Sequence, residues 1–310
     1  MIPKTEQAAL VLPIIASAIV GVAGPIFAWI TGSSAILLDG LFNLAYCLTA
    51  IFSLQVSRLL SQGSSEDFPF GFVQFEPFVN MIKGLMILGV SALAFYDAII
   101  ALTSGGRTVV AGLAVTYGLG AATIGLSTAY ILHATRRHFS SPLIEADIEN
   151  WVINGVISSI VVGAFLLIPV AEGFEQTRFL TPYIDPILVL VVIVCSILVP
   201  IRLTWASVRE LLTIAAPAGQ QSDARAALQS ALSELPDHEV DLRMARVGRT
   251  PLMLVHVVLP AEFEPGRIGD LDRIRLGAHQ ALSERFDNLM FELVFTAQRG
   301  PANTIAMVAE

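Results

Sequence analysis

Six long apolar stretches fill the first two thirds of this 310-residue chain. Each is roughly 20 residues or longer, the length that an α-helix needs to cross the hydrocarbon core of a bilayer. Only 14% of the residues are charged, well below the roughly 25% of an ordinary soluble protein. The sequence therefore predicts a multi-pass integral membrane protein with an all-α bundle of six transmembrane helices. The predicted spans are residues 8–30, 34–60, 76–102, 108–138, 142–168 and 182–212.

Arginine residues near the ends of these stretches predict the orientation of the chain. With six crossings, more of them fall on the side of the two termini than on the other side. The first group is Arg58, Arg136, Arg137, Arg202 and Arg209, and the second is Arg107 and Arg178. Because basic residues accumulate in cytoplasmic loops, we expect both termini in the cytoplasm and the protein in the plasma (inner) membrane.

The last third of the chain has the pattern of a small soluble domain. An amphipathic helix is predicted at residues 222–235, followed by strands at 241–247 and 252–259, a helix at 268–286 and a strand at 289–295. This αββαβ order is typical of a ferredoxin-like α+β layer domain. We therefore divide the chain into a transmembrane domain, residues 1–214, and a cytoplasmic domain, residues 215–310.

Two pairs of polar residues interrupt the apolar stretches at helical spacing. Asp39 and Asn43 are four residues apart in the second stretch, and Asn150 and Asn154 repeat the spacing in the fifth. Residues at i and i+4 share one face of a helix, so two such helices packed together would gather four oxygen-bearing side chains around one point. Polar groups at membrane depth are costly and mark functional sites, although asparagines also form hydrogen bonds between membrane helices.

Several other functions are disfavoured by composition. The net charge of −8 gives no general affinity for nucleic acid. Cys47 and Cys195 both lie in apolar stretches and indicate neither a disulfide framework nor a thiolate metal cluster. No nucleophile–base pair, phosphate loop or nucleotide motif is present, so we expect neither an enzyme nor a required cofactor.

Three segments together resemble the cation diffusion facilitator family. They are Ser33-Ser-Ala-Ile-Leu-Leu-Asp39-Gly, Phe68-Pro-Phe-Gly71 leading to Glu76-Pro77, and Glu145-Ala-Asp147. Six spans followed by an αββαβ tail fit the same family, and the resemblance covers nearly the whole chain. It implies a homodimer that exports a divalent metal from the cytoplasm, often in exchange for protons. It also implies that residues 1–214 are the cation-transport domain and that residues 215–310 have a dimerisation or regulatory role.

The resemblance also implies where the transport site lies. By position, the family's four metal ligands become Asp39, Asn43, Asn150 and Asn154, of which only Asp39 keeps a carboxylate. The loop site that zinc-transporting members carry falls on Phe68 and Phe72 here, and the metal-sensing histidines of the tail reduce to His256 at most. The chain thus keeps the family's scaffold and departs from it at each position that defines zinc binding.

One carboxylate and three amide oxygens form a hard-oxygen site with a charge of −1. Such a site suits Mn²⁺ or Mg²⁺ better than zinc, which prefers Cys, His and carboxylate ligands. We therefore expect manganese, magnesium or iron before zinc, although the habit of the resembled family keeps zinc open. The single charge also matches a monovalent ion. Asp147 and Glu76 are expected to gather ions at the inner mouth.

Lys83 lies about two turns inside the third stretch, and three roles remain open for it. It snorkels to the interface, it serves helix packing or a dimer interface, or it pairs with Asp39 or Asp147 as a tethered cation that the substrate displaces. Asp97 and Asp185, near the outer ends of their spans, are expected to be solvated or to cap helices.

We therefore predict a secondary cation transporter that works by alternating access, with proton antiport through Asp39. Two alternatives stay open at this point. One is a membrane partner subunit that has lost transport, which the missing carboxylates and histidines suggest. The other is a carrier of a monovalent or organic cation.

Overall fold

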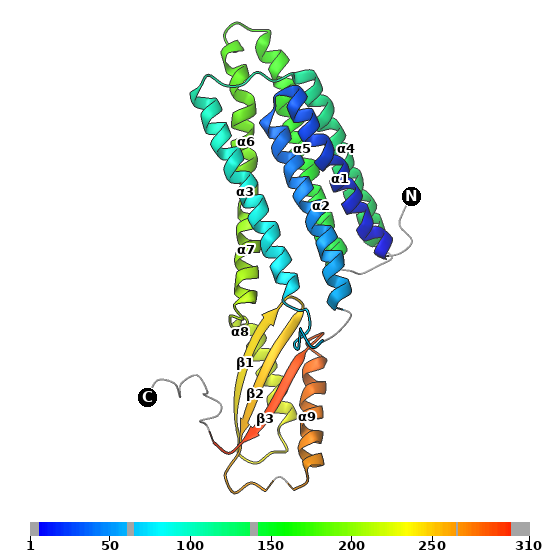
Figure 1. Ribbon diagram of the computed structural model, residues 1–310, viewed down its shortest axis with the longest axis vertical. Coiled ribbons are helices and arrows are strands. Elements are labelled where there is room, and N and C mark those ends of the chain that lie inside the picture. Colours follow the sequence, from blue (N-terminus) through cyan, green and yellow to red (C-terminus); the bar gives the residue numbers. More distant parts are fainter. Residues whose placement is uncertain (1–5, 61–64, 137–141, 265, 299–310) are drawn as a thin grey trace. The chain divides into compact units, whose positions relative to one another are not determined.

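Six helices long and apolar enough to span a membrane form the first part of the computed structural model (Figure 1), which describes residues 6–60, 65–136, 142–264 and 266–298. The first five are α1 (Glu6–Thr31), α2 (Ser34–Leu60), α3 (Phe75–Thr103), α4 (Ala111–Arg136) and α5 (Pro142–Glu172). The predicted six-span bundle is therefore confirmed. The predicted fourth span extends to residue 138, but residues 137 and 138 lie outside the described part of the chain.

The sixth span is not one continuous α-helix, which differs from the sequence prediction. It consists of a 3₁₀ helix η1 (Arg178–Tyr183), then α6 (Ile184–Ser196) and α7 (Leu198–Leu211). Pro200 has no backbone N–H to donate to the carbonyl of Ser196. The break between α6 and α7 falls where that hydrogen bond is lost.

The chain divides into two compact units. The first unit comprises Met1–Arg58 and Val79–Trp205, and the second comprises Leu59–Phe78 and Ala206–Glu310. Within the first unit, Figure 1 shows α3 and α6 on one side and α1, α2, α4 and α5 on the other. Its buried core includes Ile36, Phe165 and Val189.

Glycines allow the bundle helices to approach very closely. A Cβ atom added to Gly40 of α2 would lie 2.7 Å from the Cα of Gly24 in α1. A Cβ atom added to Gly125 of α4 would lie 3.1 Å from the Cα of Gly155 in α5. Small residues permit this backbone contact between membrane helices, so α1 packs on α2, and α4 on α5, without intervening side chains at these points.

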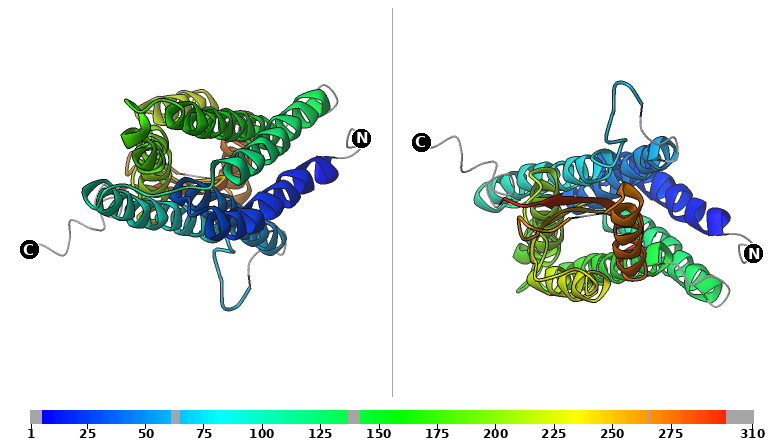
Figure 2. Two further views of the ribbon diagram at one scale, coloured as in Figure 1. Left: turned by 90° about the horizontal axis from the view of Figure 1, so that it is seen from above. Right: turned by 90° about the horizontal axis from the view of Figure 1, so that it is seen from below.

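The second unit contains the predicted αββαβ order as α8 (Ala218–Ala231), β1 (Glu239–Val247), β2 (Thr250–Val258), α9 (Ile268–Ser283) and β3 (Met290–Thr296). The sheet order is β1-β2-β3, with β1 antiparallel and β3 parallel to β2. Both helices cover the same face of the sheet (Figure 2), where their leucines bury β2 residues such as Val255 and Val257.

The first helix of this unit is shifted from its predicted position. α8 begins at Ala218 rather than residue 222, and it ends at Ala231 rather than residue 235. Pro236 disfavours helical geometry in the residue before it, and the chain turns ahead of that proline. Leu232 remains fully buried in the turn, which explains why the apolar periodicity extended past the helix end.

Candidate functional site

The polar pair of α2 lies together as its spacing predicts. The Asn43 side-chain amide donates to the backbone carbonyl of Asp39 at 2.9 Å and to the Asp39 carboxylate at 3.4 Å. Asn43 is buried, and Asp39 is half-buried. A carboxylate is therefore held inside the bundle, one helical turn from an amide that orients it.

A residue of α4 completes the environment of this carboxylate. The Tyr117 hydroxyl donates to Asp39 Oδ2 at 2.8 Å, and the Tyr117 ring packs on Phe27 of α1 with centroids 5.5 Å apart. Sequence analysis did not identify Tyr117, because its partner lies on another helix and no spacing within α4 marks it. The only available signal was a hydroxyl-bearing aromatic residue in a span that is rich in glycine and alanine.

The polar pair of α5 lies against a different part of α4. Asn154 Oδ1 is buried and has no hydrogen-bond partner in the part of the chain that the structure describes. It lies 3.5 Å from the position that a Cβ atom would take on Gly125. Asn150 is half-buried, one turn earlier. Tyr117 and Gly125 are two turns apart along α4, which is about 12 Å at the rise of an α-helix.

The structure therefore brings Asp39 and Asn43 together but does not join them to the α5 pair. In the described ranges, no hydrogen bond links Asp39 or Asn43 to Asn150 or Asn154. The described part of the chain also contains no group of three or more His, Cys, Asp or Glu side chains that could hold a metal. Asp39 and Asn154 therefore contact α4 at points two turns apart.

Lys83 of α3 contacts α2. Its ammonium lies 4.3 Å from the centre of the Tyr46 ring, within the range of a cation–π interaction. Tyr46 follows Asn43 by one helical turn. The carboxylate that interacts electrostatically with Lys83 is Asp147, and nothing in the described part of the chain pairs Lys83 with Asp39. Of the two pairings considered from the sequence, the structure favours Asp147.

Glu76 is engaged within the second unit. Its carboxylate accepts from Arg249 Nε at 3.0 Å and from the Arg249 backbone N–H at 3.2 Å. Arg249 belongs to the turn between β1 and β2, where Gly248 has a φ of 57°. Glu76 therefore anchors the turn between β1 and β2, a role that the sequence did not predict.

The positions that correspond to the zinc sites of the resembled family carry no metal-binding geometry here. The Phe68 and Phe72 rings lie 4.7 Å apart, centre to centre, and both contact Phe75. His256 is buried in β2, opposite Asp241 of β1. Aromatic packing thus replaces ligands in the loop, and His256 is part of the sheet.

A separate polar cluster lies where α1 turns into α2. Asp185, at the start of α6, is only 1% exposed. Its carboxylate accepts from the Ser33 hydroxyl at 2.6 Å, the Ser34 N–H at 3.0 Å and the Ala35 N–H at 3.2 Å. Asp185 therefore caps a helix, which is one of its two predicted roles. The helix that it caps is α2 rather than its own helix α6, and its side chain is not solvated.

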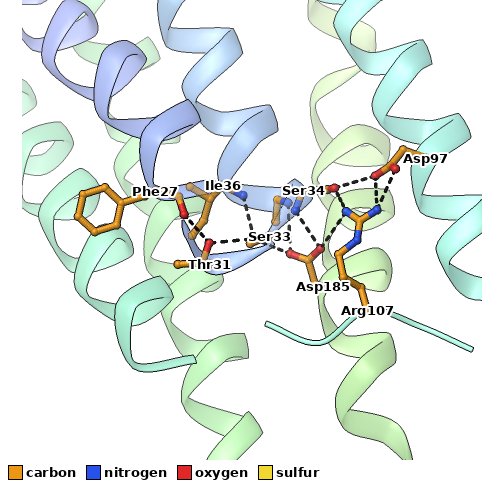
Figure 3. Close-up of polar contacts among 9 residues, drawn as sticks. Phe27, Thr31, Ser33, Ser34, Ile36, Asp97, Arg107 and Asp185 are labelled. Carbon is orange, nitrogen blue, oxygen red and sulfur yellow. Dashed lines mark hydrogen bonds and ion pairs between the residues drawn. The ribbon is translucent and has the colours of Figure 1, made fainter. Parts of the chain in front are cut away.

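Arg107 connects this cap to α3. Its guanidinium donates to both Asp97 oxygens, at 2.8 and 3.0 Å, and to the Ser34 hydroxyl. It also lies 4.0 Å from Asp185 Oδ2 (Figure 3). We call Ser33, Ser34, Asp97, Arg107 and Asp185 the Arg107 cluster. Both of its carboxylates are occupied by protein donors, so it joins helix ends and leaves little capacity for a cation.

The bundle as a whole matches a known domain. Residues 10–212 match the family model described as the cation efflux transmembrane domain. The match covers well over half of the chain and includes Asp39, Asn43, Asn150 and Asn154. No curated protein matches the chain.

Proposed function

We propose, from the premise that this chain belongs to the cation efflux family, that it exports a divalent cation from the cytoplasm in exchange for protons. The family makes it a multi-pass membrane transporter of a cation rather than an enzyme. The observation that carries the finer proposal is the Asp39 carboxylate, half-buried in α2 and held by Tyr117 and Asn43. An ionisable residue at membrane depth in a transporter is a candidate for carrying substrate or protons.

The proposed roles follow from the chemistry of each side chain. Asp39 supplies the negative charge and is the only one of the four site residues able to exchange a proton. Asn43, Asn150 and Asn154 supply neutral amide oxygens, and Tyr117 positions the carboxylate. Hard oxygen ligands with one charge favour Mn²⁺, Mg²⁺ or Fe²⁺ over zinc. The buried, unpartnered Asn154 oxygen supports this choice, because it is free to accept a cation.

The direction of transport and the assembly are part of the same proposal. The distribution of arginines supports cytoplasmic termini in the plasma (inner) membrane. Lys83 and Asp147 then lie on the inner side of the site, where the ammonium is a tethered cation that an incoming ion displaces. We further propose a homodimer in which the C-terminal α/β region provides contacts between subunits.

A second candidate function is a partner subunit that does not transport. It is favoured by one observation, namely that no cluster of three or more carboxylate, histidine or cysteine side chains suited to a metal occurs in the described chain. In that case the purified protein would carry no ion and would be recovered as a hetero-oligomer with another membrane protein.

The test is ion flux in proteoliposomes with Mn²⁺, Mg²⁺, Fe²⁺, Zn²⁺, Na⁺ and K⁺, with and without a proton gradient. We expect flux of a divalent ion that the gradient drives and that Asp39→Ala abolishes. Glu172→Gln is the matched control, because Glu172 is an exposed carboxylate at the end of α5, and it should transport normally. Retained flux in Asp39→Ala would overturn the assignment of the site, and silence of the wild-type protein across all six ions would favour the partner-subunit function.

A further inference from the structure

Ser158 differs from most hydroxyl residues of the bundle. In membrane helices the hydroxyl usually donates to the carbonyl of the preceding turn. Thr49 donates to Ala45 at 2.8 Å, Ser91 to Ile87 at 2.8 Å, and the adjacent Ser159 to Gly155 at 2.7 Å. Ser158 is only 2% exposed, yet its Oγ atom has no hydrogen-bond partner among the described residues.

An unsatisfied hydroxyl inside a protein is unfavourable, since desolvation is not repaid by a hydrogen bond. Ser158 also follows Asn154 by four residues, so both side chains lie on one face of α5. The Asn154 side-chain oxygen is likewise buried and unpartnered. Two successive turns of α5 therefore present oxygens to the bundle interior that no protein donor uses.

Contacts between α4 and α5 show where Ser158 lies along the bundle. Gly125 of α4 meets Gly155, and Gly118 of α4 meets Val162. Ser158 falls between these two contacts. On α4, Gly125 marks the level of Asn154, and Tyr117, next to Gly118, holds Asp39. Ser158 therefore lies between the level of Asn154 and the contact of Val162 with Gly118, the neighbour of Tyr117.

We propose that the Ser158 hydroxyl is a further oxygen ligand for the transported cation, placed between Asn154 and Asp39. This inference rests on the proposed function of the same site. Asn154 and Asp39 contact α4 two turns apart, at Gly125 and Tyr117, which is about 12 Å along the helix axis. A hydroxyl midway gives the ion an intermediate ligand, so that it is passed from the amide to the carboxylate in two shorter steps.

The ligand chemistry predicts the class of ion. A hydroxyl is a neutral, hard oxygen donor of the kind that suits Mn²⁺ and Mg²⁺. Replacing it with a thiol would add a soft donor at the same position, which favours zinc. Ser158→Cys therefore changes the preference between metals if the side chain touches the ion, whereas a serine that served only helix packing would leave that preference unchanged.

The experiment compares Ser158→Ala with Ser159→Ala in proteoliposomes, using Mn²⁺ as the probe. Ser159 is the matched control, because it is adjacent in α5 and its hydroxyl is already bonded within the helix. Loss of a ligand comparable to a charge-assisted hydrogen bond should raise the KM for Mn²⁺ about tenfold in Ser158→Ala. Ser159→Ala should match the wild-type protein, and the ratio of zinc to manganese flux should rise in Ser158→Cys.

The outcomes separate this inference from its premise. Wild-type flux that depends on Asp39, together with equal KM values for both alanine variants and an unchanged metal ratio in Ser158→Cys, would overturn the role of Ser158 alone. If the wild-type protein transports none of the six ions and the purified full chain does not bind Mn²⁺, the proposed function is overturned, and the role of Ser158 with it. If Ser158→Ala fails to fold, the metal ratio of Ser158→Cys decides the question by itself.

Discussion

Two sets of buried polar groups in the helical bundle differ in whether other protein groups satisfy their hydrogen bonds. In the Arg107 cluster, the Asp185 carboxylate accepts from Ser33, Ser34 and Ala35 and lies near Arg107. In the interior of the bundle, the buried oxygens of Asn154 and Ser158 have no donor among the residues that the structure describes. Because polar burial is costly unless it is compensated, the first set stabilises the fold, and the second is the set that we propose to bind the transported cation.

The comparison predicts that damage to the first set affects folding most. Asp185→Ala would leave a buried hydroxyl, two backbone donors and Arg107 without their acceptor, which we expect to destabilise the protein by about 3 kcal/mol or more. Thermal unfolding of the purified protein in detergent measures this. Asp97→Ala is the matched control, since its side chain is 44% exposed and its loss should matter less. Equal unfolding temperatures for the two variants would contradict the assigned role of Asp185.

A smaller loss of stability is expected when the guanidinium is removed. Arg107→Gln keeps a donor near Ser34 but takes away the positive charge between Asp97 and Asp185, which we expect to cost about 1–2 kcal/mol. The same unfolding assay tests it, and ion flux per folded molecule should remain. A variant with normal stability and no flux would show that Arg107 serves transport rather than stability.

The smallest expected effect concerns Tyr117, which should alter transport and spare stability. Tyr117→Phe keeps the ring that packs on Phe27 but removes the hydrogen bond to Asp39. A lost hydrogen bond of roughly 1 kcal/mol corresponds to about a fivefold lower rate of flux. Flux and unfolding temperature are measured side by side on one preparation. Lower stability with unchanged flux would show that Tyr117, like the Arg107 cluster, stabilises the fold and does not act in transport.

The sequence predicted the features that depend on one helix at a time. The lengths of the spans follow from bilayer thickness, and the contact between Asp39 and Asn43 follows from i, i+4 geometry. The αββαβ order of the tail follows from its alternating and helical periodicities. The predicted metal-binding role of Asp39, Asn43, Asn150 and Asn154 remains a prediction.

What could not be predicted depends on which helices are neighbours. Tyr117 reaches Asp39 across 78 positions of sequence, and Asp185 reaches Ser33 across 152. The turn that engages Glu76 likewise lies 173 residues away. Ser158 was overlooked for a different reason, because a serine in a membrane helix normally satisfies itself, and only the three-dimensional arrangement shows that this one does not.

The glycine contacts fix how closely the helices of the bundle can pack. Backbone lies against backbone at Gly24 and Gly40, and again at Gly125 and Gly155, so a side chain added at any of these glycines would force the two helices apart. The hydrogen bond from Tyr117 to Asp39 joins α4 to α2, so a change in the ionisation of Asp39 would alter a contact between these two helices.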